Sequence, residues 1–161
     1  MMNFQQYREL CRSASVSLGL EDPDMLANEG YMEKDGVRLA LFFDDEIVSD
    51  RLICYVDLGP IAEETRTKVF ERLLTLNLLS GTKTSGVYTI DPSSGNAIFC
   101  VHLMKPERIT SDELAGILSA YVDRTIEIQR SLLNDFDDLN FMDTVNRMFD
   151  MDQISSKTEF A

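Results

Sequence analysis

The 161-residue sequence predicts an α+β fold with a twisted antiparallel sheet, and three observations indicate this fold class. Apolar residues recur at intervals of three and four in three long segments, which is the spacing of amphipathic helices. In five shorter segments they occupy alternate positions, which is the spacing of β-strands. Tight turns join neighbouring strands, and such turns belong to antiparallel hairpins. The predicted order of elements is therefore α-β-β-β-α-β-β-α.

The first helix is predicted from Asn3 to about Leu18, and Gly19 is its expected stop. Its single apolar stripe consists of Phe4, Tyr7, Leu10, Cys11, Ala14 and Leu18. The segment from Glu21 to Asn28 is expected to be a turn with a weak extended piece, because Pro23 breaks a helix there.

Three strands are predicted next, at Gly30–Met32, Val37–Phe43 and Arg51–Leu58. Asp35-Gly36 is a strong tight-turn signal, so the first two strands should form a hairpin. Alternate apolar residues form one side of the second and third strands: Val37, Leu39, Leu41, Phe43, Leu52, Cys54, Val56 and Leu58. The opposite side is also partly apolar, with Phe42, Ile53 and Tyr55.

A central helix is predicted from about Ala62 to Leu79, after Gly59-Pro60 ends the third strand. Its apolar residues cover a broad face: Val69, Phe70, Leu73, Leu74, Leu76 and Leu79. A helix that is apolar over so much of its circumference is expected to be buried on two sides.

A second hairpin and a long helix complete the predicted core. The hairpin pairs Val87–Asp91 with Ala97–Met104 across a Pro-Ser-Ser-Gly turn. The helix runs from Ser111 to about Leu133, and Thr110 or Ser111 can cap it. Its stripe consists of Leu114, Ile117, Leu118, Tyr121, Thr125, Ile128 and Leu132.

Two regions are predicted along the chain, a folded domain at residues 1–133 and an acidic C-terminal extension at residues 134–161. The extension holds seven acidic residues against Arg147 and Lys157. A helical stripe of Leu139, Met142, Val145 and Phe149 predicts a short helix there, followed by a frayed tail.

The charge of the chain narrows the choice of partners. Twenty-eight acidic residues against fifteen Lys and Arg give a formal net charge of −13. Such a surface repels nucleic acid and anionic membranes, so neither is an expected partner; an acidic cytosolic protein with no special partner would show the same charge. The three cysteines, Cys11, Cys54 and Cys100, lack disulfide or CxxC spacing and indicate a reducing compartment. With no signal peptide and no apolar run long enough to span a bilayer, a cytoplasmic location is expected.

Candidate chemical sites are few. His102, the single histidine, shares a strand face with Cys100, but residues two apart on a strand are roughly 7 Å apart, too far for a direct hydrogen bond. The SGTKTSG loop at 80–86 lies between a helix and a strand, the reverse of a phosphate-binding loop. A calcium loop starting at Asp135 fails at Leu139 and Asn140, and acidic pairs such as Asp44-Asp45 are expected by chance in this composition. We therefore predict no catalytic residues, no metal site and no cofactor.

Three helical stripes and strands that are apolar on both faces are hard to bury completely within a single sheet layer. Stripes on helices are usually core, but strands apolar on both faces and a central helix apolar on two sides indicate interfaces.

The central part of the chain resembles a known family. The block comprises LLTLNLL (73–79), a glycine-bearing loop, GVYTID (86–91) and NAIFCVHL (96–103). Together with the element order, the acidic charge and LALFFDD (39–45), it resembles the class I chaperones of bacterial type III secretion, the CesT-like or Tir chaperone family. The resemblance covers roughly residues 3–133.

This resemblance implies a cytoplasmic bacterial chaperone that catalyses nothing and uses no cofactor. It would be a homodimer that holds the N-terminal segment of a secreted effector extended, in apolar grooves and at a sheet edge; the secretion ATPase is a further candidate partner. The implied dimer contacts are Val69, Leu73, Leu76, Val87, Tyr88 and Ile90. The implied effector-binding residues are Phe4, Tyr7, Leu10, Leu18, Leu39, Leu41, Phe43, Ile53 and Tyr55. Which side of each strand faces the effector is left open.

Two other functions are consistent with the same elements. One is a small-ligand-binding α+β domain, although the strands supply few convergent polar groups beyond Arg38, Tyr55 and His102. The other is a YbjN-like regulatory domain, which shares the architecture without a known effector.

Overall fold

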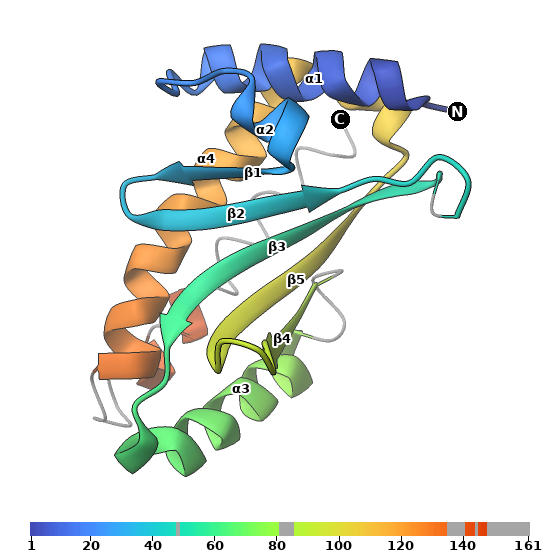
Figure 1. Cartoon of the computed structure of the whole chain (residues 1–161). Coiled ribbons are helices and arrows are strands. Elements are labelled where there is room, and N and C mark those ends of the chain that lie inside the picture. Colours follow the sequence, from blue (N-terminus) through green and yellow to red (C-terminus); the bar gives the residue numbers. More distant parts are fainter. Residues whose placement is uncertain (48, 81–85, 135–140, 144, 148–161) are drawn as a thin grey trace. The chain divides into compact units, whose positions relative to one another are not determined.

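The computed structural model describes residues 1–47, 49–80, 86–134, 141–143 and 145–147. Five strands form one antiparallel sheet in the order β1-β2-β3-β5-β4, which confirms the predicted fold class (Figure 1). The chain comprises two compact units: unit 1 is Met1–Asp57 with Cys100–Thr125, and unit 2 is Leu58–Phe99 with Ile126–Ala161.

Unit 1 begins with α1 (Phe4–Ser17), close to its predicted bounds. Asn3 accepts a hydrogen bond from the Gln6 backbone N–H, and the Gln6 side chain accepts one from the Asn3 N–H, each at 2.9 Å. This capping box satisfies backbone donors that a helix N-terminus otherwise leaves unpaired. The inward face of α1 buries Tyr7, Cys11 and Ala14.

A short helix, α2 (Met25–Glu29), lies beside α1 where the sequence indicated a turn with an extended piece, so that prediction is wrong (Figure 1). Pro23 precedes the helix, where a missing backbone N–H costs nothing, and Gly30 ends it in the left-handed conformation. Leu26 and Ala27 are buried, so tertiary packing stabilises a helix too short to form alone.

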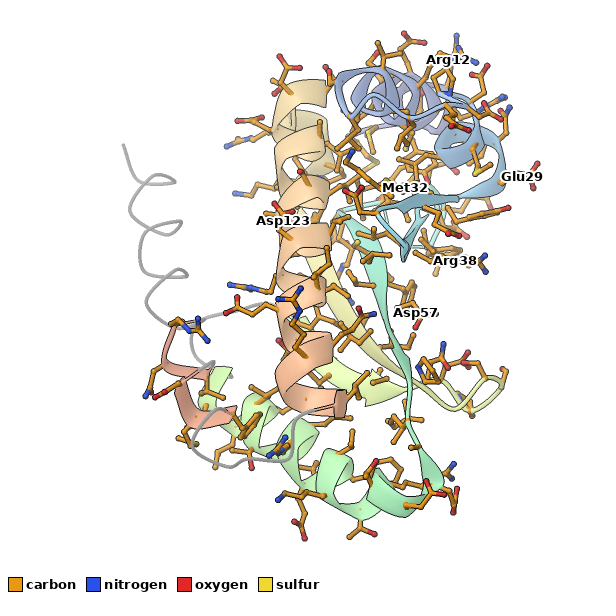
Figure 2. All side chains as sticks on the ribbon, turned by 90° about the vertical axis from the view of Figure 1, so that its left-hand side faces the viewer. Arg12, Glu29, Met32, Arg38, Asp57 and Asp123 are labelled. Atoms are coloured by element: carbon orange, nitrogen blue, oxygen red, sulfur yellow. The ribbon has the colours of Figure 1, made fainter. Side chains whose placement is uncertain are left out.

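The predicted first hairpin is present as β1 (Tyr31–Lys34) and β2 (Val37–Phe42). Asp35 and Gly36 have φ values of 52° and 78°, as a two-residue hairpin turn requires. In Figure 2, Met32 lies within unit 1 and Arg38 points outward, in agreement with their burial. Strand β3 (Arg51–Pro60) pairs with β2, so that Phe42 lies opposite Ile53 and Ala40 opposite Tyr55.

Unit 2 contains a single turn of 3-10 helix (Glu63–Thr65), α3 (Arg66–Ser80) and β4 (Gly86–Ile90). Helix α3 packs on β4 and buries Val69, Leu73 and Leu76. Tyr88 of β4 faces Phe99 of β5 (Asn96–Met104), with ring centroids 4.8 Å apart.

The last long helix, α4 (Ser111–Ile128), continues as a π-helical turn at Gln129–Asn134. Thr110 caps it as predicted: Glu113 accepts hydrogen bonds from the Thr110 N–H and hydroxyl at 2.8 and 2.9 Å. The buried residues include Ala115 and Val122, whereas Ile117 and Tyr121 are half-buried. The buried stripe is therefore turned slightly from the one predicted.

The C-terminal extension is helical at residues 141–143 and 145–147, in the region of the predicted short helix. Phe141 and Val145 are buried, and the Arg72 guanidinium of α3 lies 4.6 Å from the centre of the Phe141 ring. Met142 is exposed, and Leu139 and Phe149 lie outside the described residues. The predicted division at residue 133 stays a prediction.

Candidate binding surfaces

The polar groups of the described residues do not gather into a reactive site. His102 lies 3.4 Å from a guanidinium nitrogen of Arg51, through Nδ1, and Arg51 also binds the Asp50 carboxylate with two nitrogens at 2.8 and 2.9 Å. The hydrogen bonds from Arg51 hold the pKa of Asp50 below its ordinary value. Burial raises the pKa of the Cys54 thiol to about 12, which keeps it protonated and unreactive. Within the ranges that the structure describes, no three His, Cys, Asp or Glu side chains are grouped as metal ligands.

Apolar side chains do gather, on the open face of the sheet in unit 1. The backbone N–H of Lys105 donates to the Asp50 carbonyl at 3.0 Å, and this register sets Ile53 opposite His102 and Tyr55 opposite Cys100. The face therefore carries apolar side chains from β2, β3 and β5, with Arg51 and His102 between Met104 and the others. We call this group of apolar side chains the sheet patch; it consists of Phe42, Ile53, Tyr55, Cys100 and Met104.

The sheet patch is accessible to a partner. Phe42, Tyr55 and Met104 expose 48%, 41% and 50% of their surface, and Ile53 and Cys100 are half-buried. Burial, and then the nearby Cys100, raise the pKa of Tyr55, as expected for a phenol set among apolar neighbours. A group of large apolar side chains left uncovered on one face is typical of a binding surface.

The residues that were predicted to bind an effector fall into three environments. Tyr7, Leu39, Leu41 and Phe43 are buried in unit 1, where the Tyr7 ring stacks on Phe43 with centroids 5.2 Å apart. Leu10, Leu18 and Ile53 are half-buried. Phe4 and Tyr55 are exposed.

The outer face of α1 carries a second accessible surface. A depression of about 380 Å³ is lined by Phe4, Gln5, Arg8, Glu9 and Arg12. Figure 2 shows Arg12 on the outer side of the helix, where its guanidinium pairs with Asp24. Phe4 is the only apolar side chain lining this depression, and half of its surface is exposed.

Unit 2 exposes apolar residues on one side of α3. Phe70, Leu74 and Leu78 are four residues apart and therefore lie along one face of the helix; Leu74 and Leu78 expose 68% and 81% of their surface. We call these three residues the helix stripe. Among the predicted dimer contacts, Val87 is also exposed and Ile90 is half-buried. The other four, Val69, Leu73, Leu76 and Tyr88, are buried within the protomer.

Three residues of these surfaces were not predicted as contacts from the sequence. Phe42 was noted as lying off the main apolar face but was not named as a contact, and Met104 was not singled out. Leu78 was missing from the predicted face of the central helix, although its spacing from Phe70 and Leu74 is the signal that would have found it.

Comparison with known proteins decides the family. Residues 39–129, more than half of the chain, match the model of the Tir chaperone protein (CesT) family. The chain belongs to this family. The resemblance seen in the central block, to class I type III secretion chaperones, is thereby confirmed.

Solved structures agree with the fold of this CesT-family chain. A chain of the ExsC–ExsE complex matches with a TM-score of 0.65 and 17% identity, over 83% of this chain and 98% of that one. A chain of the HopA1–SchA chaperone–effector complex matches with a TM-score of 0.51 and 18% identity, over 80% and 94%. A search of curated protein sequences found no match. None of the described helices has the length and apolar character needed to cross a bilayer.

Proposed function

We propose that this CesT-family chain is a bacterial cytoplasmic chaperone that binds the N-terminal region of one or more type III secreted effectors. It keeps that region extended and competent for secretion, and it catalyses no reaction. The observation that carries the proposal is the exposed sheet patch in a chain of this chaperone family.

The sheet patch suits an extended segment better than a folded surface. An extended chain presents every second side chain to one face. The residues of the sheet patch also lie at alternate positions of neighbouring strands, for example Ile53 and Tyr55 of β3 beside Phe42 of β2, so the two spacings match. A segment that orders on binding loses conformational entropy, so its affinity must come from many distributed apolar contacts. Phe4, on the outer face of α1, offers an additional contact in unit 1.

Acidic substitutions in the patch test this role. We expect Phe42→Asp and Tyr55→Asp each to weaken binding of an effector N-terminal segment at least about tenfold, because a charge in the interface stays partly desolvated. Both side chains are exposed, so the fold should persist. Candidate effectors are co-expressed with the chain, and the affinity of each variant is measured on the purified pair.

Ile47→Asp is the matched control. Ile47 is 81% exposed in unit 1 but lies in the loop between β2 and β3, outside the sheet patch. Its substitution makes the same chemical change and should leave binding intact. Equal loss in all three variants, or no loss in the two patch variants, would remove the patch from the proposed function.

We further propose that two copies associate through the helix stripe. Association would cover the apolar surface that Phe70, Leu74 and Leu78 otherwise leave in water, and Val87 of β4 adds to the exposed apolar surface of unit 2. The buried residues Val69, Leu73, Leu76 and Tyr88 would then support the interface from inside each protomer rather than form it.

The mass in solution tests the dimer. Light scattering should give about twice 18.3 kDa for the wild type and 18.3 kDa for Leu78→Asp, with an unchanged circular dichroism spectrum. Leu73→Asp is expected to unfold unit 2 instead, because Leu73 is buried. A monomeric wild type, or a Leu74→Asp, Leu78→Asp double variant that stays dimeric, would contradict the helix stripe as the interface.

A further inference from the structure

The two outer strands of the sheet, β1 and β4, differ in what their outward backbone groups bind. An outer strand normally presents unpaired N–H and C=O groups on which another chain can add a strand. The sheet order makes β1 and β4 the two candidates for such addition.

In the middle of β4, the outward backbone N–H and C=O groups already have hydrogen-bond partners. Tyr88 N–H donates to Asn77 Oδ1 at 2.7 Å, and Asn77 Nδ2 donates to the Tyr88 carbonyl at 2.9 Å. One side-chain amide of α3 thus bonds both backbone groups of a single residue, as a partner strand would do.

The register shows that these Tyr88 groups point away from β5. The Asp91 N–H donates to the Asn96 carbonyl at 2.9 Å, so residues 91, 89 and 87 bond toward β5 and residues 90, 88 and 86 point to the outside. Tyr88 is the middle residue of the five in β4. The other outward-pointing backbone groups of β4 belong to Gly86 and Ile90, at the two ends of the strand.

The outward groups of β1 are arranged differently. The Leu41 N–H donates to the Gly30 carbonyl at 2.8 Å, so by alternation Tyr31 and Glu33 point their backbone groups away from β2. No strand of the described structure lies on that side of β1.

We propose that Asn77 closes the β4 edge against strand pairing with a second copy of this chain. Two β4 strands related by a two-fold axis would pair around Tyr88, and their exposed Val87 side chains would add apolar contact. Asn77 holds the central hydrogen-bonding positions of that pairing. Copies therefore associate through side chains and not through one continuous sheet.

Amide hydrogen exchange of the wild-type protein, followed by NMR, makes the first test. The Tyr88 amide should exchange at least about tenfold more slowly than those of Tyr31 and Glu33, since it is hydrogen-bonded to Asn77 and theirs point away from β2. A Tyr88 amide that exchanges as fast as those two would overturn the proposal. No effector is needed, so the outcome is independent of the proposed function.

Asn77→Leu makes the second test, because leucine has a similar size and no hydrogen-bonding group. At low protein concentration, where the variant is not yet assembled, the Tyr88 amide should exchange about tenfold faster than in the wild type. As the concentration is raised, the mass from light scattering should rise beyond that of the wild type. Thr67→Leu adds the same side chain at an exposed position of α3 and should behave as wild type. An Asn77→Leu variant with wild-type mass and exchange would refute the proposal.

Asn77→Asp tests whether assembly of the leucine variant comes from an open β4 edge or from a general loss of packing around residue 77. It keeps an acceptor for the Tyr88 N–H and puts a charge at the edge, which opposes strand pairing. It should keep the wild-type mass and a slowly exchanging Tyr88 amide. If the leucine variant does not fold, the exchange comparison in the wild-type protein still decides whether the Tyr88 groups are held by Asn77. Concentration-dependent assembly of the Asp variant would show that the edge is not what Asn77 controls.

Discussion

The Tyr7 hydroxyl, buried in unit 1, donates a hydrogen bond to the Leu41 carbonyl at 3.1 Å. Burial raises the pKa of Tyr7 above its ordinary value, so the phenol stays neutral and remains a donor. A side chain that was predicted to touch an effector therefore joins α1 to β2.

Tyr7→Phe should lower the free energy of unfolding by about 1–2 kcal/mol, because it leaves the Leu41 carbonyl buried without this donor. Urea unfolding followed by circular dichroism measures the change. Tyr55→Phe, at an exposed position, should stay within about 0.5 kcal/mol of wild type. If the two variants lose equal stability, the Tyr7 hydrogen bond has no structural role.

At the scale of single elements, the N-terminus of α4 links folding to pH. The hydrogen bonds from the Thr110 backbone and hydroxyl lower the pKa of Glu113. A carboxyl with a lowered pKa in the folded state stabilises the protein above its unfolded-state pKa. That contribution is lost as the pH falls through the lower folded-state value.

Glu113→Gln should therefore lower the urea midpoint at pH 7, and the difference from wild type should shrink as the pH falls below about 4. The measurement is a series of urea titrations from pH 7 to pH 3. Glu107→Gln, an exposed acid just before α4 that is not part of the capping box, is the control. A difference that stays constant with pH would show that the ionised carboxylate is not what matters.

Elements defined by local signals were predictable from the sequence. The Asp35-Gly36 turn fixes the first hairpin, and the Thr110 cap starts α4 where expected. Helix α2 was not predictable in this way, because five residues form a helix only when Leu26 and Ala27 pack on the rest of unit 1.

The binding surfaces were less predictable than the elements, for a physical reason. Periodicity groups the apolar residues of α3 on its circumference, but it does not say which side the protomer itself covers. Packing within unit 2 covers Val69 and Leu73 and leaves Leu74 and Leu78 in solvent. The choice depends on long-range pairing, which a helical repeat does not encode.

At the scale of the whole molecule, the C-terminal extension contributes to unit 2. Phe141 covers the buried Arg72 guanidinium of α3, and Arg147 pairs with Glu127 at 3.4 Å. A cation against an aromatic face within a desolvated site is a stabilising contact.

Phe141→Ala should destabilise the protein by about 3 kcal/mol, because it removes a large buried side chain and uncovers Arg72. Thermal and urea unfolding provide the measurement. Met142→Ala, at the neighbouring exposed position, should be close to neutral. Equal, small effects in both variants would show that the extension adds nothing to the folded unit.

The net charge of −13 gives the molecule a field that acts before any contact forms. If the effector segment is basic, this field speeds encounter, while the apolar sheet patch governs how long the complex lasts. The association rate should fall at least about tenfold between low salt and 1 M salt, with a much smaller change in dissociation rate. Stopped-flow fluorescence with a labelled effector segment measures both rates.

Tyr55→Asp should speed dissociation and leave the salt dependence of association nearly unchanged, because it adds one negative charge to a molecule whose net charge is already −13. An association rate that does not respond to salt would show that charge plays no part in bringing the partners together.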